Sequence, residues 1–269
     1  MRQILIRRAF ERRQADVQFF KAEIDNFVGQ YPIARNGIFG HCAGGAQLPL
    51  NDNWFAIGAH ACRFIKFDEN GLIQALRFQH DMRCGMSMDL SSAIAERALM
   101  HSENSYYIQN IEIVANLYKT NTPSNTAFRG FGGPQGMLAM ERVIDHIAHF
   151  LKLDPVIIRK RNFYADHQAR NRQVQRTPYG QIVNDCIIND LVDTLERTSN
   201  YKNRRQEIEN FNKLSNNIKR GISLTPVKFG ISFNKLMLNQ AGALVHVYSD
   251  GSVYLNHGGT EMGQGLFTK

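Results

Sequence analysis

The chain has 269 residues, 43 % of them hydrophobic, and a formal net charge of +8 at pH 7. This length and composition fit one large or two modest domains with a hydrophobic core. Because no run of 18 apolar residues occurs, we expect no membrane-spanning helix. The first residues also lack the apolar stretch of a secretion signal, so we expect the protein to work in the cytoplasm.

The excess positive charge is concentrated in two places. Five arginines lie in the first thirteen residues, and a second basic run extends from Arg159 to Arg176. Neither run is interleaved with aromatic residues at a binding spacing, so we expect solvated faces or a partner interface and no nucleic-acid site.

The cysteines and histidines predict no metal site built from side chains. The four cysteines stand singly and form no CxxC pair, which leaves no zinc ribbon and no iron–sulfur ligand set in this chain. Their separation favours free thiols in a reducing cytoplasm. His146 and His149 lie three residues apart beside an apolar helix face, and we interpret them as structural.

In chain order, the first elements are weakly defined. Residues 8–28 predict a helix, and residues 29–55 are rich in glycine and predict a loop. From residue 61 the pattern is clearer, with strands over 61–67 and 72–80 joined by the turn sequence Asp68–Gly71. A helix is predicted over 90–101, with Asp89 or Ser91 as its cap.

The central feature is residues 126–137, which follow a predicted strand over 111–118. Four glycines lie within seven residues there, and Pro134 then begins an amphipathic helix that ends near Pro155. A glycine-rich loop that feeds a helix presents free N–H groups and a positive dipole end, which suits a polar or anionic ligand.

The later elements are predicted by the same patterns. A short helix over 156–162 is followed by a polar linker over 165–180 and by helices over 181–198 and 201–215. We then predict strands over 221–233, 241–248 and 252–256, with a hairpin turn at 249–251, and the start of a helix at the end of the sequence.

Two glycine-rich segments carry a family resemblance. Residues 126–137 resemble the molybdenum-cofactor loop of the xanthine dehydrogenase and aldehyde oxidase family, and residues 257–269 resemble its second cofactor loop. Segments between them, including 228–233 and 245–255, keep the family's order, so the resemblance covers roughly residues 56–269.

The resemblance implies an α+β fold with mixed sheets and helices, in which two subdomains meet at a molybdopterin site, here incomplete. It places a poorly matched segment at 1–55, the first molybdopterin-binding subdomain at 56–164, and the truncated start of the second at 165–269.

Site residues are implied by the same resemblance. Arg97 would be catalytic and hold the substrate's oxygen, although an arginine beside a glutamate is otherwise usually an exposed ion pair. Phe131 would lie over the flat face of a heteroaromatic substrate, Phe233 would pack against its edge, and Asn234 stands where the family commonly has threonine. The implied cofactor-binding residues are Arg129, Gly130, Phe131, Met262, Gly263 and Gln264.

The implied function is part of a molybdenum hydroxylase that oxidises hypoxanthine to xanthine and xanthine to urate. Molybdenum–molybdopterin would be its cofactor, with iron–sulfur clusters and FAD on other domains or subunits of an oligomer. The family's glutamate base, in a Gly-Glu-Pro-Pro motif, does not occur here, so we expect this fragment alone to be inactive. The alternatives are an aldehyde oxidase-type fragment, against which Arg97 argues, and a non-catalytic basic binding module.

Overall fold

The computed structural model describes residues 2–8, 53–54, 59–165, 174–230, 233–261 and 265–268. The chain divides into two compact units, Met1–Phe229 and Gly230–Lys269, and each is treated by itself. Of the helix predicted over 8–28 only Arg8 is described, and it ends a strand instead. Of the loop predicted over 29–55 only Asn53–Trp54 is described, and these two residues form a short strand. None of the helices in the described parts of the chain has the length and apolar character needed to span a bilayer.

The first unit contains a five-stranded mixed sheet in the order β1-β5-β4-β3-β2. The strands β1 and β3 pair antiparallel with β5 and β4, whereas β4 and β5 pair parallel. Their bounds are β1 Arg2–Arg8, β2 Asn53–Trp54, β3 Ala59–Phe67, β4 Ile73–Gly85 and β5 Asn110–Lys119. The mixed sheet agrees with the predicted α+β class.

The predicted turn between β3 and β4 is confirmed. The carboxylate of Asp68 accepts hydrogen bonds from the backbone N–H groups of Asn70 and Leu72, each at 2.9 Å. Gly71 has a φ of +79°, which a side chain would disfavour. The two strands therefore form the hairpin that the turn sequence predicts.

Helix α2 (Ser91–His101) forms the crossover between the parallel strands β4 and β5. Parallel neighbours need such a crossover because a tight turn cannot join them. The prediction of a side-chain cap by Asp89 or Ser91 is wrong, because Leu90 occupies the cap position without a side-chain hydrogen bond. The helix begins with a backbone hydrogen bond from the N–H of Ile94 to the carbonyl of Leu90.

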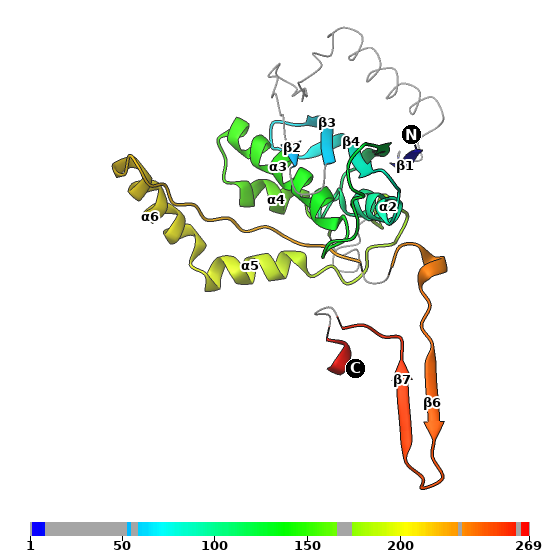
Figure 1. Ribbon diagram of the computed structural model, residues 1–269. Helices are drawn as coiled ribbons and strands as arrows, with labels where there is room; N and C mark the ends of the chain where they lie inside the picture. The colour runs from blue at the N-terminus through cyan, green and yellow to red at the C-terminus, as the bar shows by residue number, and fades with distance from the viewer. Residues whose placement is uncertain are drawn as a thin grey trace. The chain divides into compact units, whose positions relative to one another are not determined.

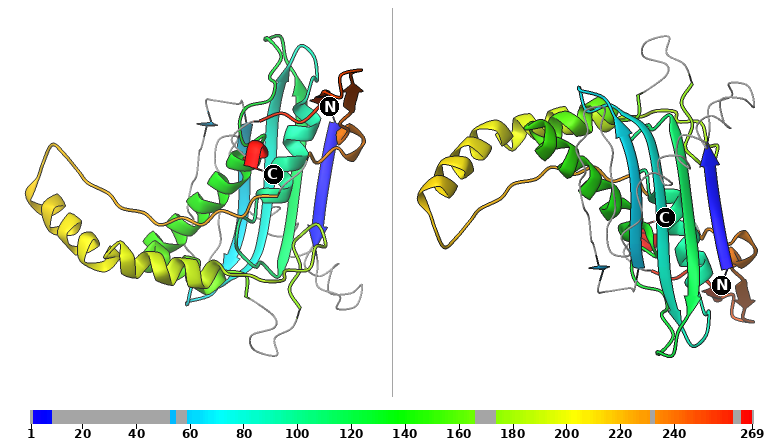
Figure 2. Two further views of the ribbon diagram at one scale, coloured as in Figure 1. Left: turned by 90° about the horizontal axis from the view of Figure 1, so that it is seen from below. Right: turned by 90° about the horizontal axis from the view of Figure 1, so that it is seen from above.

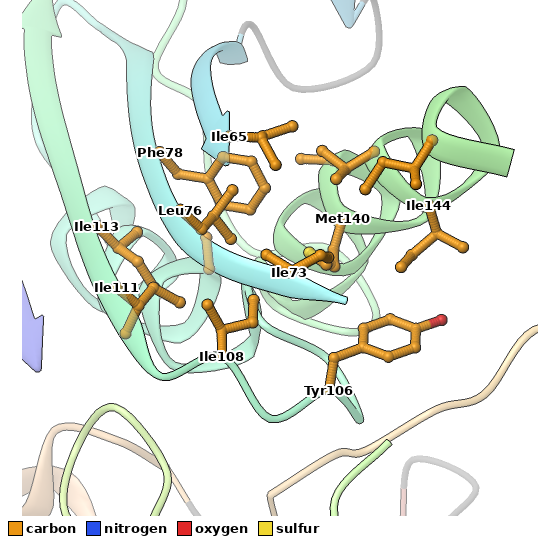
Figure 3. Packing of buried hydrophobic residues seen from close by; sticks show 14 of the residues in the cluster. Ile65, Ile73, Leu76, Phe78, Tyr106, Ile108, Ile111, Ile113, Met140 and Ile144 are labelled. Carbon is orange, nitrogen blue, oxygen red and sulfur yellow. The ribbon is translucent and has the colours of Figure 1, made fainter. Parts of the chain in front are cut away.

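Helices α2 and α3 (Gly133–Leu151) cover one face of the sheet (Figures 1 and 2). The apolar positions of α3 recur at helical spacing, so Met140 and Ile144 face the strands (Figure 3). On the sheet side, Leu76, Phe78 and Ile113 are buried in the same cluster. This packing fixes α3, and with it the glycine-rich loop at its start.

An ion-pair cluster joins α3 to α4 (Pro155–Asn162), which begins one residue before its predicted start at 156. Asp154 caps this helix by accepting from the N–H of Val156. Arg159 is only 1 % exposed and binds Glu141 at 2.8 Å and Asp145 at 2.9 Å. Part of the basic run from Arg159 is therefore internal, which corrects the expectation that the whole run is a solvated face or a partner surface.

Two later predictions of secondary structure are wrong in part. Helix α5 (Ile188–Thr198) begins seven residues after the predicted start at 181. The backbone before it turns at Thr177–Gly180, and the N–H of Val183 donates to the carbonyl of Gln175 instead of joining a helix. Residues 221–230, predicted as strand, belong to none. Helix α6 (Tyr201–Leu214) agrees with its prediction.

The second unit contains the predicted hairpin, β6 (Ala243–Val247) paired with β7 (Val253–His257). Asp250 accepts from the N–H of Ser252 at 2.9 Å, and Gly251 has a φ of +83°, as the turn sequence predicts. Two short 3-10 turns complete the unit, η1 (Leu236–Leu238) and η2 (Leu266–Thr268). The predicted terminal helix is thus limited to η2 within the described residues.

Candidate functional site

The glycine-rich loop has an unusual backbone. Three consecutive residues have positive φ angles: Gly130 at 88°, Phe131 at 53° and Gly132 at 104°. Phe131 is strained there because a side chain disfavours this region. Hydrogen bonds hold the loop, from Phe131 N–H to the Phe128 carbonyl at 2.8 Å and from Gly133 N–H to the Gly130 carbonyl at 2.9 Å. The predicted passage from loop into helix, with Pro134 in the first turn, is confirmed.

The loop is packed directly against helix α2. A Cβ added to Gly132 would lie 2.1 Å from the carbonyl oxygen of Ile94, and one added to Gly136 would lie 2.4 Å from that of Ala98. Both distances are too short for any side chain, so these glycines permit a close approach of two backbones. Arg97 lies between these two contact points in the sequence of α2.

Arg97 is buried, with 6 % of its surface exposed. Arg97 thus lacks the exposure that an arginine beside a glutamate usually has. The ring centroid of Phe229 lies 5.2 Å from the guanidinium carbon, within cation–π range. Burial lowers the pKa of Arg97, and the nearby Tyr179 acts in the opposite direction. An arginine nevertheless keeps its charge at neutral pH.

His101 completes this group of side chains. Its ring lies 4.7 Å from that of Phe229, and its Nδ1 donates to the Arg97 carbonyl at 2.8 Å. Burial, together with the charges of Arg97 and Lys228, lowers the pKa of His101 to about 4, although its hydrogen bond to the Arg97 carbonyl acts in the opposite direction. The imidazole is therefore neutral at neutral pH, and it fixes the backbone at Arg97 rather than adding a charge.

A buried network holds the segment that delivers Phe229. Asn104 donates to Glu141 at 2.8 Å and to the Pro226 carbonyl at 2.9 Å, and it accepts from the N–H of Lys228 at 3.1 Å. The ammonium group of Lys228 pairs with Glu103. The segment bonds to side chains instead of a neighbouring strand, which is why the predicted strand does not form.

The predicted site residues fall into three groups. Arg97 and the loop residues Arg129, Gly130 and Phe131 belong to the first unit, where Arg129 is exposed and Phe131 is half-buried. Phe233 and Asn234 belong to the second unit, in which Asn239 accepts from the N–H of Phe233 at 3.1 Å. The third group, Met262, Gly263 and Gln264, lies outside the described residues. The common pocket for these residues stays a prediction.

Two residues of this region were missed from the sequence. Phe229 belongs to a segment that matches the family pattern, but nothing in its spacing pointed to Arg97. Gln135 lies in the first turn of α3, and both atoms of its side-chain amide are buried without a hydrogen-bond partner among the described residues. An unsatisfied buried amide beside the loop is the kind of group that a pterin's polar ring edge would satisfy.

A cavity of about 760 Å³ lies elsewhere in the first unit, between the ends of α3 and α6. Its walls carry charges of both signs, including Asp145, Lys152, Arg205 and Glu209. None of the predicted site residues lines it, so the cavity does not bear on the site.

Comparison with known proteins gives the family. Two models, each described as a molybdopterin cofactor-binding domain, match residues 62–163 and 194–269. These matches confirm molybdenum–molybdopterin as the cofactor of the family. The subdomain boundary predicted after residue 164 stays a prediction.

Curated relatives are similar over 76 % of the chain. The chain is 47 % identical to xanthine dehydrogenase of Dictyostelium discoideum, 45 % to xanthine dehydrogenase 1 of Arabidopsis thaliana, and 46 % to xanthine dehydrogenase/oxidase of Gallus gallus. It spans 14–15 % of the length of these relatives.

Solved structures show the same fold at lower identity. The aldehyde oxidoreductase of Desulfovibrio desulfuricans matches with a TM-score of 0.55 and 22 % identity over 73 % of this chain and 20 % of that one. The enzyme of Desulfovibrio gigas matches with a TM-score of 0.52 and 20 % identity over the same shares. The chain belongs to the xanthine dehydrogenase/aldehyde oxidase family of molybdenum hydroxylases and consists largely of its molybdopterin-binding domains.

Proposed function

We propose that this chain forms part of the active site of a molybdenum hydroxylase that oxidises purines, hypoxanthine to xanthine and xanthine to urate. The observation that carries the proposal is the buried Arg97 on a helix locked against the glycine-rich loop. A fixed, desolvated cation beside a cofactor loop suits a substrate on which negative charge develops. The names of the similar relatives support the same substrate class.

Arg97 would hold the substrate's oxygen through its N–H groups. A hydrogen bond to a charged group contributes roughly 1.5–3 kcal/mol of stabilisation. The hydrogen bond from a buried donor becomes stronger as negative charge develops on the substrate in the transition state. His101 would contribute by fixing the backbone carbonyl of Arg97. Phe131 would cover the flat face of the purine, and Phe233 and Asn234 would contact it from the second unit.

Molybdenum–molybdopterin, when bound, supplies the oxygen-transfer and electron-accepting chemistry. Residues Arg129 to Phe131 would hold it on one side, together with the buried amide of Gln135. Met262, Gly263 and Gln264 would hold it on the other. The close glycine contacts fix these residues against α2.

We further propose that the whole protein uses iron–sulfur and FAD groups outside this chain, acts as an oligomer and works in the cytoplasm. Among the described residues Cys84 and Cys186 form no disulfide, which suits a reducing compartment. We expect residues 1–269 alone not to oxidise xanthine.

The test is a comparison of Arg97→Met with wild type in the full-length enzyme loaded with cofactor. Loss of the hydrogen bond to charge should lower xanthine turnover at least tenfold, since this corresponds to roughly 1.5–3 kcal/mol. Arg204→Met, which removes an exposed arginine from α6, is the matched control and should leave turnover unchanged. Equal xanthine kinetics in wild type and Arg97→Met would refute the assigned role.

Assays of the same proteins with an aldehyde, together with their molybdenum and pterin content, separate the alternatives. An enzyme that oxidises aldehydes but not xanthine would support the aldehyde oxidase alternative. Protein that binds neither molybdenum nor pterin would support the non-catalytic alternative.

A further inference from the structure

We propose that Phe229 is a positioning residue for Arg97, and that its ring determines how well the site discriminates purines from substrates that do not need the arginine. This inference rests on the proposed function, because it assigns a device to the same site. It starts from a contact that the sequence did not predict.

The contact joins the guanidinium of Arg97 to the ring of Phe229, with 5.2 Å between the guanidinium carbon and the ring centroid. Cation–π attraction is stronger where water is excluded, and Arg97 is 6 % exposed. The ring therefore stabilises a charge that burial otherwise disfavours.

An aromatic ring attracts a guanidinium group without accepting the N–H groups in its plane. A carboxylate partner accepts the guanidinium's N–H groups and competes with a substrate oxygen for them. A ring attracts the cation through its π-system and contacts the flat face of the guanidinium when the two stack. Phe229 can thus hold the side chain in one orientation without itself accepting the N–H groups that would bind the purine's oxygen.

The ring is itself held in place from three directions. A Cβ on Gly133 would lie 2.4 Å from Cε2 of Phe229, so the absence of a side chain at Gly133 leaves the space that the ring occupies. The imidazole of His101 packs on it at 4.7 Å. The preceding residue, Lys228, is fixed through its N–H to Asn104.

This arrangement gives Gly133 a role apart from the turn. Gly133 is not among the loop residues with positive φ, unlike Gly130 and Gly132. Its hydrogen atom in place of a side chain admits an aromatic ring from a segment almost a hundred residues further along the chain. The loop therefore links the proposed cofactor contacts to the residue that orients Arg97.

The experiment uses the full-length enzyme loaded with cofactor and compares Phe229→Leu with Phe229→Tyr. Leucine keeps an apolar side chain but removes the π face, whereas tyrosine keeps the ring. We expect Phe229→Leu to lower kcat/KM for xanthine about three- to tenfold, with little change for an aldehyde, which corresponds to about 0.7–1.4 kcal/mol. Phe229→Tyr should retain most of the xanthine activity.

Phe211→Leu is the matched control. The ring of Phe211 lies 3.9 Å from the guanidinium carbon of Arg220, in a second cation–π pair that contains no site residue. Its loss should leave both substrates unaffected. Phe229 is 46 % exposed, so its replacement by leucine should not prevent folding.

A double-mutant cycle supplies a readout that does not depend on activity. If the contact is real, the losses of melting temperature caused by Phe229→Leu and Arg97→Met should not add in the double variant. Additive losses would overturn the proposal. An equal fall in xanthine and aldehyde turnover in Phe229→Leu would also overturn it, since that pattern marks a general structural role.

The outcomes also separate this inference from the proposed function. If wild-type enzyme fails to oxidise xanthine, the proposed function fails, and the melting-temperature cycle still decides whether Phe229 holds Arg97. If xanthine is oxidised and Arg97→Met impairs it while Phe229→Leu does not, only the inference about Phe229 fails.

Discussion

The two units of the chain obtain their structure in different ways. In the first, the sheet and the helices α2 and α3 share a continuous buried core, and residues such as Phe78 and Ile113 are fully enclosed (Figure 3). In the second, every residue of β6 and β7 is exposed, including Val245 and Leu255. The hairpin is defined by its turn and its pairing alone.

The difference shows what local signals can and cannot do. A turn such as Ser249–Gly251 specifies a hairpin without a core, but an isolated two-stranded hairpin is marginally stable in water. The first unit can hold Arg97 and the glycine loop in fixed positions because close packing constrains both. In the second unit, Asn239 holds the backbone of Phe233 through two hydrogen bonds.

The largest expected effect comes from breaking the buried ion pair of the first unit. Arg159→Met would leave Glu141 buried without its cation, which costs about 3–5 kcal/mol. Hydrogen exchange of the β4 and β5 amides, followed by mass spectrometry on the full-length protein, should show the loss. Lys160→Met, which removes a more exposed pair with Asp193, should cost at most about 1 kcal/mol. Equal effects of the two variants would contradict the importance of the buried pair.

A slightly smaller effect is expected where two backbones touch. Gly136→Ala places a methyl group 2.4 Å from the Ala98 carbonyl, so α2 and α3 must separate at a cost of about 1–3 kcal/mol. Gly221→Ala is the control, because nothing lies within 4 Å of its Cβ position. That variant should be neutral or slightly stabilising. Melting temperatures of both variants check the comparison, and a neutral Gly136→Ala would show that the helices do not depend on close approach.

These two sites also show how far the sequence could be interpreted. Periodicity predicted the core face of α3, and turn residues predicted both hairpins, because these signals are local. The pairing of β1 with β5 was missed, since a contact between distant segments leaves no local pattern. The alternation over 221–230 predicted a strand, but Asn104 and Glu103 bind that segment instead.

The candidate site divides in the same way. The glycine loop could be predicted as a turn into a helix from its residue types. The role of Arg97 came from the family resemblance, because its burial, with only 6 % of its surface exposed, cannot be deduced from a neighbouring glutamate. Phe229 could not be predicted, since its contact with Arg97 depends on the space left by Gly133.

A pH-dependent effect on stability is expected in the first unit. Burial lowers the pKa of His101 to about 4, below its ordinary value near 6.5, so the unfolded chain binds the proton more strongly. The stabilisation is complete above about pH 6.5 and is lost as the pH falls towards 4. His101→Gln should therefore show a smaller fall in melting temperature over this window than wild type. Identical pH profiles would show that His101 does not contribute.

The smallest effect is expected in the second unit. Leu255→Ala removes an exposed side chain from β7, so it should change stability by less than about 0.5 kcal/mol. The amides that pair β6 with β7 should exchange far faster than those of β4 and β5 in the same experiment. Strong protection of the hairpin amides would mean that another part of the whole protein covers these strands.

The pairing of β1 with β5 sets an order of events during synthesis. Arg8 pairs with Ile111, so the two strands are separated by roughly a hundred residues of chain. At translation rates of about 5–20 residues per second, the ribosome needs about 5–20 s to deliver β5 after β1. During that interval β1 cannot pair with β5, whereas β3 and β4 can pair as soon as both have emerged. This edge of the sheet is thus closed last, by the strand that is made before β3, β4 and β5.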